Sequence, residues 1–245
     1  MESVPSTIKK AASVRPKGRL KRFAVIGLLL IIGVPAVAHV VWKYSGSGEW
    51  QRLPEQGGIR AYSMKTPGST VVKYKGVTRF QTTLTTITSF MQDPTTCDDV
   101  GCINPVVLDT VSPQVQYMSF VYPYGPFQAR EFVVKVDVSQ DPATKAVLVQ
   151  YAGDPDRIAL NDCCVRVPHM NNSWRFKPLG NGEVEVEYVL DMYEGGGIPY
   201  FVANWIHEKT VYRALAKVAK IVMSDKYRQK YRDVQLEFIH EGTTG

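Results

Sequence analysis

The part of this chain that most restricts its fold is residues 23–42, which read FAVIGLLLIIGVPAVAHVVW and contain no Asp, Glu, Lys or Arg. As an α-helix with a rise of about 1.5 Å per residue, this segment would be roughly 30 Å long, which is the hydrocarbon thickness of a bilayer. Residues 1–22 hold seven Lys or Arg and one Glu. A basic flank of this kind favours the cytoplasmic side. The sequence therefore predicts a basic cytoplasmic tail over 1–22, a single-pass transmembrane anchor over 23–42, and an exported domain.

The same segment also fits a cleaved signal peptide. Ala36-Val37-Ala38 places small residues at the spacing of a signal peptidase site, after the apolar run 23–34. Cleavage near Ala38 would release a soluble secreted or periplasmic protein, whereas an uncleaved segment would tether the domain to the membrane. Both interpretations place the domain outside the cytoplasm.

The positive charge of the chain lies in its tail. The whole chain has a formal net charge of +6, from 29 Lys or Arg and 23 Asp or Glu, and residues 1–22 account for all of it. A nucleic-acid-binding domain would be expected to carry its excess charge on the folded part. The sequence therefore predicts no nucleic-acid partner, a linker over 43–49, one domain over 50–232 and a C-terminal tail over 233–245.

Four cysteines fall into two pairs. Cys97 and Cys102 bracket the polar loop DDVG, and a disulfide between them would close that turn in an oxidising compartment. Cys163 and Cys164 are neighbours, and we expect two reduced thiols on a strand. Neither pair has the spacing of a zinc site, so no metal is predicted.

The pattern of apolar residues predicts a mixed α and β domain. Residues 183–193 alternate, with Glu183, Glu185 and Glu187 on one side and apolar residues on the other, as expected for a half-buried strand. Further strands are predicted, with turn residues between them, over 57–64, 71–77, 114–122, 130–138, 146–151, 163–167 and 173–178. A helix is predicted over 82–91. The strands are expected to form one meandering antiparallel sheet.

A long amphipathic helix is predicted after Gly195-Gly196-Gly197-Ile198-Pro199. Its apolar positions run at three- and four-residue steps from Ile198 to Met223, and its other side is basic. Such a basic side is either a solvated surface or a surface that docks on a membrane.

Motifs of catalysis are missing from the sequence. It contains no GxSxG, HExxH, P-loop or GxGxxG pattern. The four histidines, His39, His169, His207 and His240, stand far apart. We therefore predict no catalytic residues, no cofactor and no enzymatic activity.

An ordered set of short segments resembles the START family, the StAR-related lipid transfer domains of the SRPBCC superfamily. The segments are GIRAY at 58–62, VVKYKGV at 71–77, AREFV at 129–133, VR at 165–166, WRFKP at 174–178, EYVLD at 187–191, GGIP at 196–199 and Asn204. The resemblance implies an α+β helix-grip fold, a curved antiparallel sheet wrapped on a long C-terminal helix. The hydrophobic N-terminal helix predicted above precedes this domain in the sequence. It also implies an elongated apolar cavity that encloses one lipid.

The candidate ligand contacts are inward aromatic residues and the polar residues beside them. They are Tyr117, Arg130, Arg166, Trp174, Tyr188, Phe201, Asn204 and Trp205. The alternative for the aromatic residues is ordinary core packing. For the two arginines it is a structural ion pair, Arg130 with Glu131 and Arg166 with Asp162.

Three functions remain open. The first is binding, and transfer, of a lipid or another hydrophobic small molecule by a membrane-tethered or exported domain. The second is a membrane-anchored ligand sensor or interaction protein, whose protein partner the sequence does not name. The third is an enzyme on the same fold, similar to aromatase/cyclase relatives, which would need acid or base residues such as His169 or Asp191 inside the cavity.

Overall fold

The computed structural model describes residues 17–241 in two compact units, one ending at Tyr44 and one beginning at Ser45. Residues 1–16 of the predicted basic tail and residues 242–245 of the predicted C-terminal tail lie outside the described residues, as do the side chains of residues 17–21, 24, 25 and 28–30.

The first unit is helix α1 (Lys17–Tyr44), which includes the predicted segment 23–42 and contains Pro35. Several of its described apolar side chains are exposed, among them Ile31, Val37 and Val41. Within the part of the chain that the structure describes, no helix was found that combines the length and the apolar character needed to cross a membrane.

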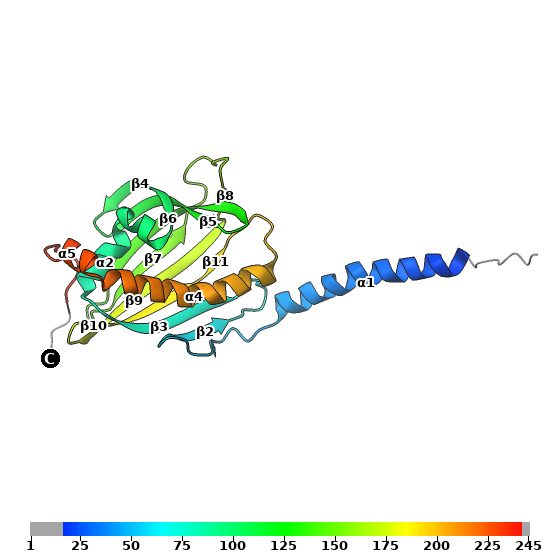
Figure 1. Cartoon of the computed structure of the whole chain (residues 1–245), viewed down its shortest axis with the longest axis horizontal. Helices are drawn as coiled ribbons and strands as arrows, with labels where there is room; N and C mark the ends of the chain where they lie inside the picture. Colours follow the sequence, from blue (N-terminus) through cyan, green and yellow to red (C-terminus); the bar gives the residue numbers. More distant parts are fainter. Residues whose placement is uncertain (1–16, 242–245) are drawn as a thin grey trace, which may run out of the picture. The chain divides into compact units, whose positions relative to one another are not determined.

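The second unit is built on one large curved sheet (Figure 1). Along the sheet the main strands follow the order β1-β2-β3-β10-β9-β7-β6-β5-β4, with β11 beside β9 and β8 beside β6. All of these pairings are antiparallel except β6 with β8. The strands are β1 (Gln51–Arg52), β2 (Arg60–Met64), β3 (Lys73–Gln81), β4 (Ile103–Ser112), β5 (Val115–Tyr124), β6 (Phe127–Gln140), β7 (Val147–Gly153), β8 (Val165–Arg166), β9 (His169–Gly180), β10 (Glu183–Leu190) and β11 (Met192–Tyr193).

Strand β10 shows why this sequence forms the sheet. Its alternate residues Val184, Val186, Tyr188 and Leu190 are buried, because successive side chains of a strand point to opposite faces. The three glutamates on the other face pair with basic residues of β3 or β2, as Lys75 does with Glu187 at 3.7 Å. The alternation predicted for this strand is therefore confirmed.

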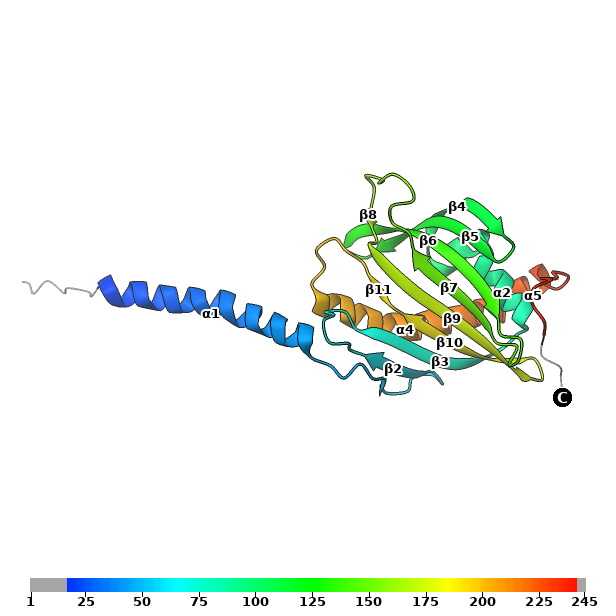
Figure 2. The ribbon, with the colours of Figure 1, turned by 180° about the vertical axis from the view of Figure 1, so that it is seen from behind.

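The long C-terminal helix α4 (Tyr200–Val222) lies across one face of the sheet, in front of it in Figure 1 and behind it in Figure 2. It packs most closely where it crosses β3. A Cβ atom at Gly76 would lie 2.4 Å from Cδ1 of Leu215, so a larger residue at this strand position would require the Leu215 side chain to move. The shorter helices are α2 (Leu84–Gln92), η1 (Pro94–Thr96), α3 (Cys97–Val100) and α5 (Asp225–Lys230).

The structure corrects two expectations about local structure. Strand β4 was not predicted, and it forms one edge of the sheet. Cys163 and Cys164 lie in a turn and form a disulfide with each other, whereas two thiols on a strand were expected. On a strand, neighbouring side chains would point to opposite faces; a turn removes that restriction.

Candidate functional site

A cavity of about 410 Å³ lies between the sheet, α4 and the segment α2-η1-α3. Most of the residues around it are apolar or aromatic. Those from the helical segment, the loop after it and the start of β4 are Phe90, Met91, Asp93, Pro94, Thr96, Cys97, Val100, Cys102 and Pro105. Those from the sheet and the loop before α4 are Met118, Phe120, Tyr122, Pro123, Tyr124, Phe132, Tyr151, Met170, Asn172, Trp174, Tyr188, Leu190, Met192 and Glu194. Helix α4 adds His207, Thr210, Arg213, Ala214, Lys217 and Val218.

Stacked aromatic rings form the sheet side of the cavity. Trp174 of β9 and Tyr188 of β10 are opposite each other in the register of the two strands, and their ring centroids lie 4.2 Å apart. Phe120 and Phe132 stack in the same way on β5 and β6, at 5.2 Å. These pairs form because the cross-strand positions of an antiparallel sheet bring side chains of one face together.

An ionisable pair interrupts this apolar lining. Glu194 lies in the loop before α4, His207 lies on α4, and their side chains are 1% and 2% exposed. His207 Nε2 is hydrogen-bonded to Glu194 Oε1, and the hydroxyl of Tyr124 donates to the same oxygen at 2.6 Å. Burial raises the pKa of Glu194, but the hydrogen bond and the charge of His207, with the bond from Tyr124, lower that pKa to a net value below the ordinary one. Glu194 is therefore a carboxylate.

A buried arginine holds the loop that carries Glu194. Arg130 is 1% exposed, and its guanidinium donates to the main-chain carbonyls of Glu194 and Gly195, each at 3.2 Å, and to that of Gln128. A Cβ atom at Gly196, whose φ is +67°, would lie 2.8 Å from Nη2 of Arg130. Glycine is required there both for the backbone conformation and for the approach of the arginine.

Several residues around the cavity also reach the surface, and they mark its opening. Arg213 and Lys217 of α4 and Pro123 of β5 line the cavity and are exposed. The segment η1-α3 lies on the same cavity, and its Cys97 forms a disulfide with Cys102, which follows α3.

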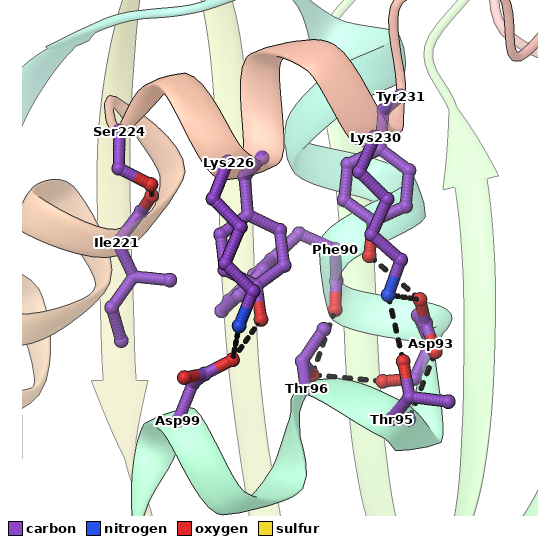
Figure 3. Close-up of polar contacts among 11 residues, drawn as sticks. Phe90, Asp93, Thr95, Thr96, Asp99, Ile221, Ser224, Lys226, Lys230 and Tyr231 are labelled. Carbon is purple, nitrogen blue, oxygen red and sulfur yellow. Dashed lines mark hydrogen bonds and ion pairs between the residues drawn. The ribbon is translucent and has the colours of Figure 1, made fainter.

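Helix α5 attaches to this segment through polar contacts (Figure 3). Lys226 lies 2.7 Å from Asp99, Lys230 lies 2.7 Å from Asp93, and the hydroxyl of Tyr231 donates to Asp93 at 2.8 Å. Tyr227 also donates to Asp99. We call these six side chains the α5 cluster.

Comparison with solved structures identifies the architecture. A STAR-related lipid transfer protein from Xanthomonas axonopodis is 20% identical, and the match covers 73% of this chain and 100% of that one with a TM-score of 0.67. Human STARD10 is 11% identical, with 91% and 86% covered and a TM-score of 0.67. The lipid transfer and protein localization domain of human StarD13 is 15% identical, with 84% and 98% covered and a TM-score of 0.61. The chain has the START helix-grip fold.

Sequence comparison adds one relative. A protein of Pseudomonas aeruginosa, described as uncharacterized, is 25% identical over 179 residues, which is 71% of this chain and 88% of that protein. No family model matches the chain.

The START fold brings two of the eight predicted contact residues to the cavity, Trp174 and Tyr188. Three others make structural contacts. Arg130 holds the loop described above, and Arg166 pairs with Glu131 at 2.9 Å. Asn204 is buried, accepts from the main-chain N–H of Val72 at 2.9 Å and donates to the carbonyl of Thr70 at 3.1 Å.

The expectation that Tyr117, Phe201 and Trp205 face the interior is wrong. Met118, Phe120 and Tyr122 line the cavity, so Tyr117 belongs to the other face of β5, where Arg157 lies 3.4 Å from its ring centre. Phe201 and Trp205 are 65% and 59% exposed. The buried stripe of α4 begins at Ala203 and Asn204 and continues through His207, Val211 and Leu215, and the two large aromatic residues lie out of phase with it.

Sequence reasoning missed Glu194 and His207. His207 is three residues after Asn204 and four before Val211, so it falls on the buried stripe of the START helix. An ionisable residue in such a stripe is the signal that could have found it. His169 and Asp191, the residues required by the enzyme hypothesis, contact each other at 3.3 Å and are not among the residues that line the cavity. Among the described residues, no cluster of potential metal ligands was found.

Proposed function

We propose that this chain binds one lipid, or another hydrophobic small molecule, in the cavity between the sheet and α4. The observation that carries the proposal is the cavity itself, which has a wall of stacked aromatic rings and a volume within the range of small-molecule sites. The similar proteins described as lipid transfer proteins support it. The proposal is limited to binding: His169 and Asp191, the residues named for an enzyme, do not line the cavity, whereas the Glu194–His207 pair does.

The test is a substitution that fills the cavity with a large side chain and leaves its polar groups unchanged. Ala214 of α4 lines the cavity, whereas Ala216, two residues further, is exposed. Ala214→Trp should reduce the lipid that co-purifies with the chain, as measured by native mass spectrometry and lipid extraction. Ala216→Trp on the same helix is the matched control and should retain it.

The outcomes separate the three functions. A stoichiometric ligand that is lost only in Ala214→Trp supports binding, and its recovery in chemically unchanged form argues against an enzyme. A wild-type chain that is empty and also takes up no sterol, fatty acid or phospholipid would favour the sensor or interaction protein.

We also propose that residues 23–42 tether the domain to a membrane, with residues 1–22 in the cytoplasm and the domain exported. The support is the uncharged length of this segment, the basic residues in front of it and the exposed apolar side chains of α1. A short tether would confine the domain to tens of ångströms of one membrane, so transfer would be a hand-over to a neighbouring membrane or protein.

Cell fractionation tests the tether. The full chain should stay in the membrane pellet after alkaline extraction, and a chain without residues 1–42 should not. A mature protein whose N-terminus lies just after Ala38 would instead establish signal cleavage. Recovery of the uncleaved full chain in the soluble fraction would contradict both interpretations.

A further inference from the structure

The cavity contains two buried polar atoms that lack a hydrogen-bond partner in the structure described here. They are Oε2 of Glu194 and Nδ1 of His207. The other atoms of the pair are satisfied, since Glu194 Oε1 accepts from both Tyr124 and His207. Buried polar groups of folded proteins are almost always hydrogen-bonded, and a carboxylate oxygen without a partner is especially costly. Both residues line the cavity, so a ligand bound there lies next to the pair.

The chemistry of the pair restricts the ligand group. A carboxylate only accepts hydrogen bonds, so His207 Nε2 must carry the proton that faces it. Oε2 therefore requires a donor from the ligand. Nδ1 accepts a hydrogen bond in the neutral imidazole ring and donates one in the charged ring. A hydroxyl group both donates and accepts, so it can serve Oε2 and is compatible with Nδ1 in either state.

The charges around the pair disfavour a charged ligand group. Arg130 lies directly behind Glu194, with its guanidinium bonded to the Glu194 carbonyl and 5.0 Å from the ring centre of Tyr124. This region thus holds one buried arginine, Arg130, and one buried carboxylate, Glu194. A phosphate or carboxylate would add a negative charge beside Glu194, and an ammonium would add a positive charge that no further carboxylate of the cluster balances.

We propose that Glu194 and His207 form a hydroxyl-recognition site, and that the cavity takes an uncharged lipid whose polar end is a hydroxyl group. This inference rests on the proposed function. A sterol and an acyl-chain alcohol or glyceride share this chemistry.

The experiment compares ligands that differ only at the polar end. The full chain is titrated with oleyl alcohol, oleyl methyl ether, oleate and oleylamine, and separately with cholesterol and cholesteryl methyl ether, with native mass spectrometry as the readout. The alcohol should bind at least about tenfold more tightly than its methyl ether, which has no donor for Oε2, and more tightly than the acid or the amine. Preference for the oleyl pair or the sterol pair identifies the source of the hydroxyl.

The results that would refute the hydroxyl site differ from those that would refute lipid binding. Equal affinity for alcohol and ether, or a preference for oleate or oleylamine, would refute the hydroxyl site and leave lipid binding intact. Binding of none of the probes would also refute the hydroxyl site, and if the chain in addition takes up no phospholipid, the proposed function itself is refuted.

The variant Glu194→Gln tests whether Glu194 causes the preference for the alcohol over the ether. Glu194→Gln keeps the size of the side chain but removes the carboxylate, so the ratio of alcohol to ether affinity should fall to near one. Glu187→Gln, on the face of β10 that pairs with Lys75, is the matched control and should keep the wild-type ratio. Circular dichroism checks that both variants fold. If Glu194→Gln does not fold, the wild-type ratio still decides, since equal affinities there refute the site.

Discussion

Arg130 joins two parts of the chain that are distant in sequence. Its side chain extends from β6 and bonds the carbonyls of Glu194 and Gly195, in the loop before α4. Because its donors are fully buried, the carbonyls that they satisfy have no water to replace them. Arg130 thus fixes the position of Glu194 in the cavity.

Arg130→Met should destabilise the domain by about 3 kcal/mol or more, because it leaves the buried main-chain carbonyls of Glu194 and Gly195 without their donors. Denaturant unfolding measures this change. Arg175→Met, on the exposed side of β9, should change the free energy of unfolding by no more than about 0.5 kcal/mol. Similar effects of both variants would show that Arg130 has no special role.

At the scale of single residues, the sequence predicted the cavity only where strand alternation is clear. Trp174 and Tyr188 lie on strands whose pattern fixes the inward face. Phe201 and Trp205 were misplaced because the first turns of α4 carry apolar residues on several faces, so size and hydrophobicity could not set the phase. Glu194 has no periodic pattern around it, since it lies in a loop whose position depends on Arg130.

Polar contacts near both ends of helix α5 attach it to the segment α2-η1-α3. Asp93 and Asp99 belong to the segment α2-η1-α3, and Lys226 and Lys230 belong to α5 (Figure 3). Burial raises the pKa of Asp93, but hydrogen bonds from Lys230, Thr95 and Tyr231 outweigh it and lower that pKa to about 2. The cluster therefore requires the ionised carboxyl group.

The α5 cluster should make stability depend on pH. The folded-state pKa of Asp93 lies below the ordinary value of 3.8, so its contribution is complete above that value and is lost as the pH falls toward about 2. Asp93→Asn should lower the free energy of unfolding by about 1 to 2 kcal/mol at neutral pH. The loss relative to wild type should shrink as the pH falls through this range.

Urea unfolding at a series of pH values measures this dependence. Asp156→Asn, at an exposed loop position, is the control and should follow the wild-type curve. A constant difference between Asp93→Asn and wild type at all pH values would contradict the role of the carboxylate.

Most elements were predictable because their residues repeat with the period of a strand or a helix. Strand β4 was not, since as an edge strand it exposes Val106, Val107 and Val111 and lacks the alternation of a half-buried strand. The apolar stripe predicted for the long helix runs to Met223, and α4 ends at Val222. The basic residues 226–232 continue the sequence pattern of the helix, and only their contacts with Asp93 and Asp99 show that a separate helix forms.

At the scale of the molecule, the described residues 17–241 form α1 and a domain with its own core. The strands found in this part of the chain, and the cavity, lie in the unit that begins at Ser45. A unit that contains its entire core is expected to fold independently.

A chain that starts at Ser45 should therefore unfold cooperatively, with a free energy of unfolding within about 0.5 kcal/mol of that of the domain in the full chain. Denaturant titration of both chains, followed by tryptophan fluorescence, measures the difference. A broad transition or a large loss of stability would show that α1 is part of the domain's fold.

The pairing of β3 with β10 restricts the order in which this protein can fold during its synthesis. Residues 73–81 find their central partner only at residues 183–190, and α4 follows later still. While the ribosome is making the intervening strands, β2 and β3 have no place in the sheet, and its apolar concave face has no cover. Closing such a long loop is slow, so the domain completes its folding after synthesis, and the unfinished chain needs protection from aggregation until α4 is made.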